Sequence, residues 1–369
     1  MRTLTARPAL RWLLPLVLLL VLLGSVLFST RASADPALPE RSAEQLLVDL
    51  QTAQVDGLSG TVVQTADLGI PAIPGAADSP AGQLTSLLAG SHTMRVWYSG
   101  PDKLRLAQVD QQYAESDVIV NGREVWTYES RDKKATHRTL SADQRKGAAE
   151  KVPADAPKTP EEAAKLLLTK LGPTTQVSTD RTVTVAGRDA YELVLSPQAA
   201  QSASLIKQVR VAIDGTTHLP LRVQVLGAGA KPAFEVAYTD GLTIGRPEDR
   251  VFDWNPPKGT DVTEAKTPEH KAPTKAQRKD LEQRKSQAEK DTTVVGSGWT
   301  SVLVTKLPAD AATSNETVRG FLGQLAPVSG TWGSGRELDG TIVTAILTDD
   351  GGLAVGAVGS EALQQALAR

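Results

Sequence analysis

Cysteine is absent from this sequence of 369 residues, and aromatic residues make up only 4% of it. The missing cysteines exclude disulfides, thiolate metal ligands and the lipid-acceptor cysteine of bacterial lipoproteins. The four histidines are isolated, without a second ligand at metal-binding spacing, and no Gly-x-Ser-x-Gly nucleophile elbow occurs. We therefore expect no metal, no cofactor and no enzymatic activity, and a hydrolase is the least favoured reading of the sequence. With so few aromatics, the core must be built from Val, Leu, Ile and Ala.

Residues 1–34 have the composition of a targeting segment. Three arginines precede an apolar block, Trp12–Phe28, and Ala32-Ser33-Ala34 offers a cleavage site with small residues at its first and third positions. The block is only just long enough to span a membrane, so a cleaved signal peptide and a retained N-terminal anchor both remain open. In either case the rest of the chain is expected to be exported and extracytoplasmic.

The charge of the exported part is mildly acidic. Removing residues 1–34 takes away four Arg and no acidic residue, which leaves 36 Lys and Arg against 42 Asp and Glu. A surface with this balance argues against nucleic acid as a main partner, because nucleic-acid binding rests largely on Lys and Arg at the phosphates.

The stretch His92–Arg138 carries the main structural signal. Short segments of alternating apolar and polar residues are separated by turn signals, the clearest of which is Asn121-Gly122 between two apolar runs. Similar segments continue to Tyr238, so the sequence predicts about ten consecutive antiparallel strands between Ser59 and Thr243. A sheet of that length should curl into an open half-barrel.

Two helices are expected on the concave side of this sheet. Ser42 and Gln45 form a capping box before Ala43–Val55, where Gly57 is the expected stop, and Thr159 caps a helix at Pro160–Leu171. Between the first two strands lies a long Pro- and Gly-rich excursion. It is either a floppy loop or a lid over the sheet, with Leu84, Leu87 and Leu88 at helical spacing as the lid residues.

The chain beyond the sheet changes character. Residues 258–292 are highly charged and almost free of apolar residues, which is typical of a solvated linker or an exposed helix. Residues 293–369 then show strand and helix patterns of a second, small α+β domain. We therefore expect an α+β protein with a half-barrel domain at 35–257, a charged linker at 258–292 and a C-terminal domain at 293–369.

Six short motifs in this order resemble the LolA/RseB family of exported half-barrel proteins, which bind lipid or lipoprotein acyl chains. They are Leu58-Ser59-Gly60-Thr61-Val62, Gly100-Pro101-Asp102-Lys103-Leu104-Arg105, Ser116-Asp117 with Asn121-Gly122-Arg123-Glu124-Val125-Trp126-Thr127-Tyr128, Gly187-Arg188-Asp189-Ala190-Tyr191-Glu192-Leu193, Ile213-Asp214 with Leu219-Pro220-Leu221-Arg222, and Phe252 with Asn255-Pro256-Pro257-Lys258-Gly259. The C-terminal domain looks similar to forms seen in high-GC Gram-positive bacteria. LolA-type carriers usually have Arg before the sheet proline, where this chain has Gly100, so the resemblance implies the fold and apolar-ligand binding more strongly than shuttling of lipoproteins to an outer membrane.

Two binding functions follow from this resemblance. One is a carrier that holds a lipid or lipoprotein acyl chain in an apolar cavity. The other is an RseB-like regulator that binds the extracytoplasmic segment of a membrane partner such as an anti-sigma factor. A solidly filled core, with no cavity, remains a third outcome for the concave side.

Period-two alternation predicts which side chains face the helices. The expected cavity wall consists of Met94, Val96, Tyr98, Leu104, Leu106, Trp126, Tyr191, Leu193, Val211 and Val223. These positions alternate with arginines such as Arg105, Arg210 and Arg222, which are rarely fully buried unless paired and should point outward.

Overall fold

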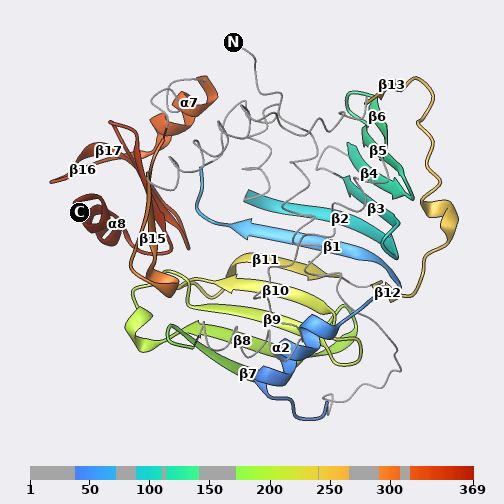
Figure 1. The fold of residues 1–369 in the computed structure, drawn as a ribbon, viewed down its shortest axis with the longest axis horizontal. Coiled ribbons are helices and arrows are strands. Elements are labelled where there is room, and N and C mark those ends of the chain that lie inside the picture. The colour runs from blue at the N-terminus through green and yellow to red at the C-terminus, as the bar shows by residue number, and fades with distance from the viewer. Residues whose placement is uncertain are drawn as a thin grey trace, which may run out of the picture.

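The computed structural model describes residues 38–71, 89–109, 114–140, 172–239, 241–265, 291–307 and 316–369, which form a large curved sheet and a smaller second sheet (Figure 1). The large sheet has thirteen strands within these residues, in the order β13-β6-β5-β4-β3-β2-β1-β11-β10-β9-β8-β7, with β12 paired to β1. The strands are β1 (Gly57–Asp67), β2 (Ala89–Ser99), β3 (Lys103–Val109), β4 (Glu115–Asn121), β5 (Glu124–Glu129), β6 (Lys134–Thr139), β7 (Thr175–Val185), β8 (Arg188–Pro197), β9 (Gln208–Asp214), β10 (Pro220–Leu226), β11 (Pro232–Tyr238), β12 (Thr243–Ile244) and β13 (Asp261–Glu264). All pairs are antiparallel except β13 with β6. The prediction of consecutive antiparallel strands is therefore confirmed only in part. The sheet consists of two meanders, β1–β6 and β7–β11, that join where β1 pairs with β11, and it has three strands more than expected.

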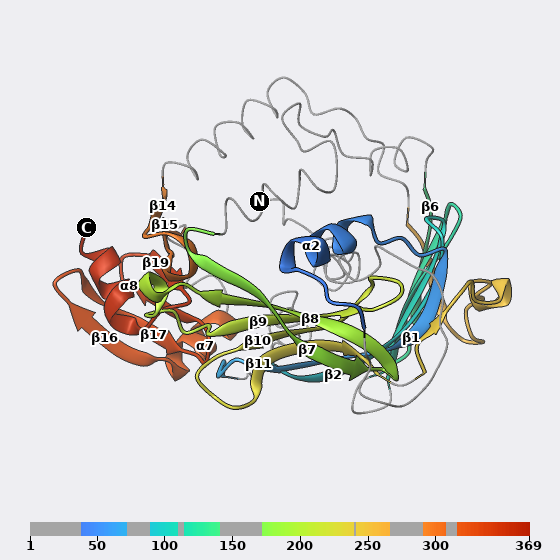
Figure 2. The same cartoon turned by 90° about the horizontal axis from the view of Figure 1, so that it is seen from below.

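The sheet is strongly bent, and helix α2 (Ala43–Thr52) lies inside the bend, over β7 and β8 (Figure 2). Ser42 begins the helix as predicted: its hydroxyl accepts from the Gln45 amide, and the Gln45 side chain accepts from the Ser42 amide. Leu46 and Leu47 are buried against the sheet. The helix is shorter than expected and ends at Thr52, not at Val55, because Ala53 is already extended.

Two glycines show how turns and close contacts shape the sheet. Gly122 has φ of 62° in the β4–β5 turn, the left-handed region expected for Asn-Gly hairpins. The expectation that Gly57 is a left-handed helix stop is wrong, since this residue opens β1 with no positive φ. Its role is steric: a Cβ atom there would lie 2.6 Å from the Arg246 Cα atom.

The second sheet has six strands in the order β14-β15-β19-β18-β17-β16. They are β14 (Thr292–Val295), β15 (Val302–Lys306), β16 (Ala326–Gly330), β17 (Gly333–Asp339), β18 (Thr344–Thr348) and β19 (Gly352–Gly356), accompanied by α7 (Glu316–Gln324) and α8 (Ser360–Leu367). Helix α8 packs on one face through Leu363 and Ala366. Asp349-Asp350 forms the β18–β19 hairpin turn.

Hydrogen bonds link the two sheets. Just before β9, the Leu205 amide donates to the Ala357 carbonyl at 2.7 Å, and just after β1 the Thr341 amide donates to the Leu68 carbonyl at 2.9 Å. The Trp299 indole also donates to the Thr175 hydroxyl at 2.7 Å. These bonds attach the small domain across one end of the large sheet (Figure 1).

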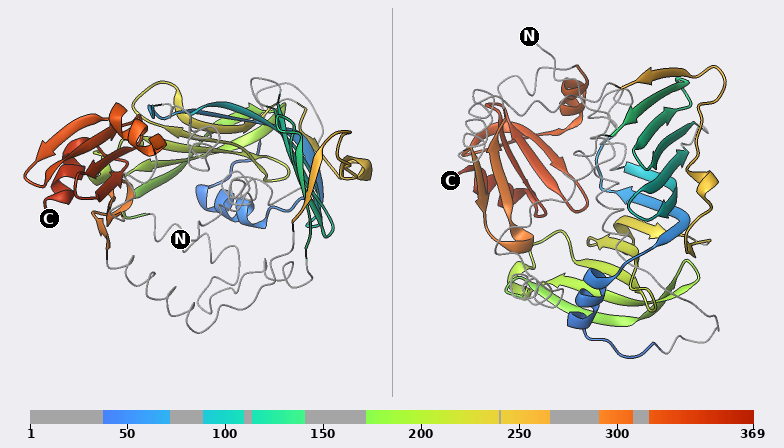
Figure 3. Two further views of the ribbon diagram at one scale, coloured as in Figure 1. Left: turned by 90° about the horizontal axis from the view of Figure 1, so that it is seen from above. Right: turned by 45° about the vertical axis from the view of Figure 1, so that its right-hand side comes forward.

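A segment after β12 runs along the outside of the β3–β6 part of the sheet (Figure 3). We call this segment, Glu248–Ala265, the strap; it contains a 3-10 turn, η3 (Asp249–Val251), and ends in β13. Because β13 belongs to the large sheet, that sheet continues into the stretch expected to be linker, beyond the predicted boundary at 257.

Several predictions fall outside the described residues. These are the targeting segment at 1–34, the lid residues Leu84, Leu87 and Leu88, and the second helix at Pro160–Leu171. Among the helices that the structure describes, none is long and apolar enough to cross a membrane.

Candidate ligand-binding face

The strand register decides which side chains share the concave face. Residues directly opposite one another in an antiparallel pair point to the same side of the sheet. Tyr98 is opposite Leu104, and Val96 is opposite Leu106. Met94 is opposite Val62.

The same face continues across the other half of the sheet. Leu193 is opposite Val211, which is opposite Val223. Tyr191 lies two residues from Leu193 on the same strand and contacts α2 in one cluster with Leu46. Nine of the ten expected residues therefore lie on the same face of the sheet as Tyr191 and Leu193, which pack with α2.

Trp126 is the exception, and its predicted orientation is wrong. Val118 shares the concave face with Leu106, and Thr127 is opposite Val118, so the neighbouring Trp126 points to the convex side. There it stacks on His137, with ring centroids 4.1 Å apart. Alternation within one strand could not reveal this, because the face depends on how the β4–β5 hairpin is registered.

Four of the nine inward residues are packed core. Val96 and Leu106 are fully buried among the side chains of β1 and β11, and Leu193 and Tyr191 are buried beneath α2. The Tyr191 hydroxyl donates to the Pro39 carbonyl at 2.8 Å. The filled-core alternative is thus correct for the part of the sheet under α2 and for the β1–β3 centre.

The remaining inward residues are only half-buried. Together with four valines that sequence reasoning missed, they make up what we call the concave trough: Met94, Tyr98, Leu104, Val120, Val125, Val209, Val211, Val223 and Val225. The signal for the missed residues was available, since Val120 and Val125 flank the Asn-Gly turn and must pair across it. Burial raises the pKa of Tyr98, assisted by the nearby Asp56 carboxylate, so its hydroxyl remains protonated at neutral pH.

The convex face carries the charges, as the arginine positions predicted. Arg210 and Arg222 donate to the two oxygens of the buried Glu192 carboxylate at 2.7 and 2.8 Å. Nearby, burial would raise the pKa of Asp214, but hydrogen bonds from Arg188 and the Thr217 amide outweigh it and hold that pKa below its usual value. These two buried ion-paired clusters therefore lie on the side away from the trough, whereas Arg138, which is opposite Val125, shares the trough face.

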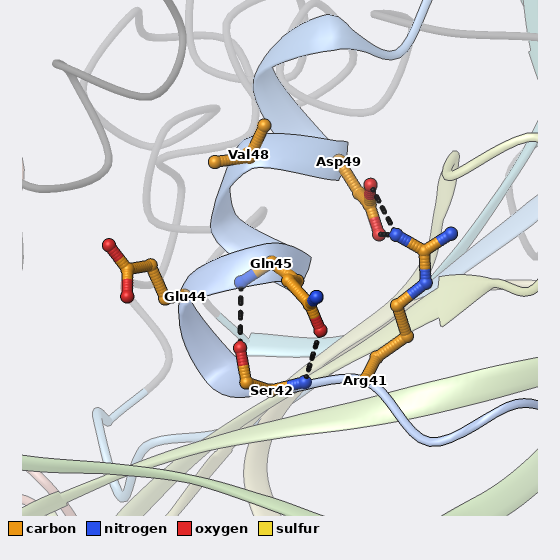
Figure 4. Close-up of a pocket in the computed structure, with 6 residues that line it drawn as sticks. All are labelled: Arg41, Ser42, Glu44, Gln45, Val48 and Asp49. Atoms are coloured by element: carbon orange, nitrogen blue, oxygen red, sulfur yellow. Dashed lines mark hydrogen bonds and ion pairs between the residues drawn. The ribbon is translucent and has the colours of Figure 1, made fainter.

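One described pocket lies against α2 and has a volume of about 400 Å³ (Figure 4). Its lining residues are Arg41, Ser42, Glu44, Gln45, Val48 and Asp49. The Arg41 guanidinium is 3.1 Å from the Asp49 carboxylate. With Val48 as its one apolar residue among those named, this pocket is chemically unlike an acyl-chain site.

Nothing in the described residues suggests a metal centre: no group of three or more His, Cys, Asp or Glu side chains is close enough to hold an ion. His137 and His218, two of the four isolated histidines, both have carboxylate partners. His218 Nδ1 lies 3.7 Å from an Asp49 oxygen.

No protein-family model matches the chain, and no curated protein sequence does. Solved structures similar to it include LolA superfamily proteins and MucB. The complex of Pseudomonas aeruginosa MucA and MucB aligns over 88% of this chain and 96% of the other at 15% identity, with a TM-score of 0.39. The LolA superfamily protein NE2245 from Nitrosomonas europaea aligns over 58% and 98%, at 12% identity and a TM-score of 0.21. A putative outer membrane lipoprotein-sorting protein domain from Vibrio parahaemolyticus aligns over 53% and 89%, at 10% identity and a TM-score of 0.19.

Proposed function

We propose that this protein is an exported binding protein that holds the acyl chain of a lipid or lipoprotein against the concave trough, without catalysing a reaction. The proposal rests on the strand register of the large sheet, which decides which side chains share a face. It gathers half-buried Val, Leu, Met and Tyr side chains from β2, β3, β4, β5, β9 and β10 on one face of a bent sheet, and it sends the paired charges to the other face.

The physical basis is burial of apolar surface. Each methylene of a bound chain that leaves water contributes about 0.8 kcal/mol, and half-buried valines gain from being covered in the same way. Such a site needs few polar groups for affinity, so the trough suits an alkyl chain better than a sugar or a nucleotide.

A titration with a fluorescent fatty acid tests the proposal. Val223→Asp places a charge in the trough, while Val294→Asp places one on an exposed residue of the second sheet and serves as the matched control. We expect wild type and the control to bind alike and Val223→Asp to bind at least about tenfold more weakly, equivalent to about 1.4 kcal/mol. Absence of binding in wild type, or equal affinity of both variants, would contradict the carrier function.

A regulator of a membrane partner is the second candidate. The observation favouring it is an apolar pair on the second sheet: Val294 is opposite Leu303, and these side chains are 60% and 38% exposed on the face away from α8. Exposed apolar pairs of this kind are common at protein interfaces. If Val294→Asp abolishes capture of the extracytoplasmic segment of a co-encoded anti-sigma factor while Val223→Asp does not, the regulator is favoured over the carrier.

A further inference from the structure

The strap is fastened to the convex face strand by strand. Its contacts are Lys103 Nζ to Asp249 at 2.7 Å from β3, Asn121 Nδ2 to Asp253 Oδ1 at 3.0 Å from β4, and the ring of Trp254 against Trp126 and Tyr128 of β5 at 5.3 Å each. The Phe252 side chain, which is part of the strap, is buried. The strap thus crosses the outside of β3, β4 and β5 before it reaches β6.

The last part of the strap is held differently. All four side chains of β13 are exposed, so no apolar burial keeps this strand in place. Its backbone is bonded to β6, with the Asp261 amide donating to the Lys133 carbonyl at 2.8 Å and the Ala265 amide to the His137 carbonyl at 2.7 Å. A four-residue parallel edge strand of this kind is weak, so any side-chain contact to it matters.

His137 supplies that contact and is engaged at both ring nitrogens. Nδ1 is 2.9 Å from Glu264 Oε1 on β13, and Nε2 is 2.6 Å from Glu124 Oε2 on β5. A neutral imidazole has one donor and one acceptor, whereas an ionised carboxylate only accepts. Both contacts can therefore be hydrogen bonds only when the ring is protonated, and loss of the proton leaves one nitrogen lone pair facing a carboxylate.

The charges around the His137 ring also favour its protonated form. The charged groups that contact the ring are Glu264 from β13 and Glu124 from β5, while Trp126, which stacks on the ring, is uncharged. Burial lowers the pKa of His137, but the hydrogen bonds and charges of Glu264 and Glu124 outweigh it and raise the pKa above its usual value.

We propose that His137 is a proton-operated latch that fastens β13 to the edge of the large sheet and lets it go when the ring is neutral. Because its pKa is raised in the folded protein, the latch is fully closed below the ordinary histidine value of about 6.5. It opens as pH rises through the higher folded value. β13 is the last element that the structure describes before the second sheet, so the latch controls where the chain leaves the half-barrel.

Hydrogen exchange of the Asp261 and Ala265 amides, normalised to the intrinsic rate at each pH, tests the latch in the full-length protein. In wild type we expect protection to fall by about fivefold between pH 6 and pH 9, the change in the opening equilibrium that corresponds to losing a largely exposed ion pair of about 1 kcal/mol. In His137→Gln the low protection should already be present at pH 6 and should not vary with pH. The control, His92→Gln, changes a histidine on β2 far along the sheet and should follow wild type.

A second variant keeps the test decisive if His137→Gln folds poorly. Glu264→Gln changes an exposed residue of β13, and it should lose the pH dependence of the two amides while the melting temperature stays near that of wild type. Constant protection in wild type from pH 6 to pH 9, or a wild-type profile in Glu264→Gln, would overturn the proposal, as would an NMR titration that places the His137 pKa below 6.5.

Discussion

Replacing Asp117 is the most informative test of how the convex face contributes to stability. Its side chain is 1% exposed on β4, and one of its oxygens is 2.7 Å from Arg105 Nη2. Burial raises the pKa of Asp117 to about 6; the Arg105 guanidinium lowers it in part, and the Glu115 carboxylate raises it again. Arg105 also donates to the Val251 carbonyl in the strap at 3.4 Å.

The consequence for stability follows from the difference between folded and unfolded pKa values. With an ordinary Asp value of 3.8 in the unfolded chain, the folded state binds the proton more tightly. The stabilising contribution of the protonated form is therefore complete below about pH 4 and is lost as pH rises through 6. The difference between the two pKa values corresponds to about 3 kcal/mol.

Asp117→Asn removes this proton and retains an oxygen that can accept from Arg105. Urea unfolding of wild type and variant at several pH values between 4 and 7.5 isolates the effect, because all other groups titrate in both proteins. We expect the variant to gain about 3 kcal/mol relative to wild type over this range, whatever its stability at pH 4. If the unfolding free energies of wild type and variant change with pH in parallel, or if the variant loses stability relative to wild type at higher pH, the ion pair with Arg105 and not burial sets the pKa of this carboxyl group.

Further variants test the core, the trough, the convex face and the β4–β5 turn. Leu106→Ala should cost about 2–5 kcal/mol in urea unfolding because this side chain is fully buried, whereas Val223→Ala should cost about 0.8 kcal/mol because part of its surface is already exposed. Glu192→Ala leaves two arginines without their carboxylate and should lower the unfolding free energy by about 3 kcal/mol; a loss below 1 kcal/mol would mean that water replaces it. Gly122→Ala forces alanine to φ of 62° and should cost about 1–2 kcal/mol, measured by the same unfolding assay. If residues 1–34 are a cleaved signal, the intact mass of the exported protein will correspond to a chain that begins at Asp35, and a membrane-bound full-length chain would indicate an anchor.

Local patterns predicted the elements of the half-barrel well. The capping box at Ser42 and the hairpin at Asn121-Gly122 each depend on neighbouring residues, and both are present. Nine of the ten expected inward side chains are on the concave face, because alternation is a local property of each strand.

What could not be predicted depends on contacts between distant segments. The strap packs on strands that precede it by more than a hundred residues. Its last part, residues 258–265, was expected to belong to the charged linker, and only the pairing of β13 with β6 shows that it joins the sheet. The sequence also could not distinguish packed core from trough. Leu104 and Leu106 are the same residue type on the same face of β3, but only Leu106 is fully buried.

The position of β1 has a consequence for the order of folding. This strand lies between β2, which follows it in sequence, and β11, whose Tyr238 is opposite Val62. During synthesis the first strands can form a meander, but one edge of β1 stays unpaired until most of the half-barrel has emerged. Pairing over such a separation is slow, and an exposed edge with Val62 and Val63 can pair with other chains in the meantime. We therefore expect slow refolding that becomes aggregation-prone as protein concentration rises.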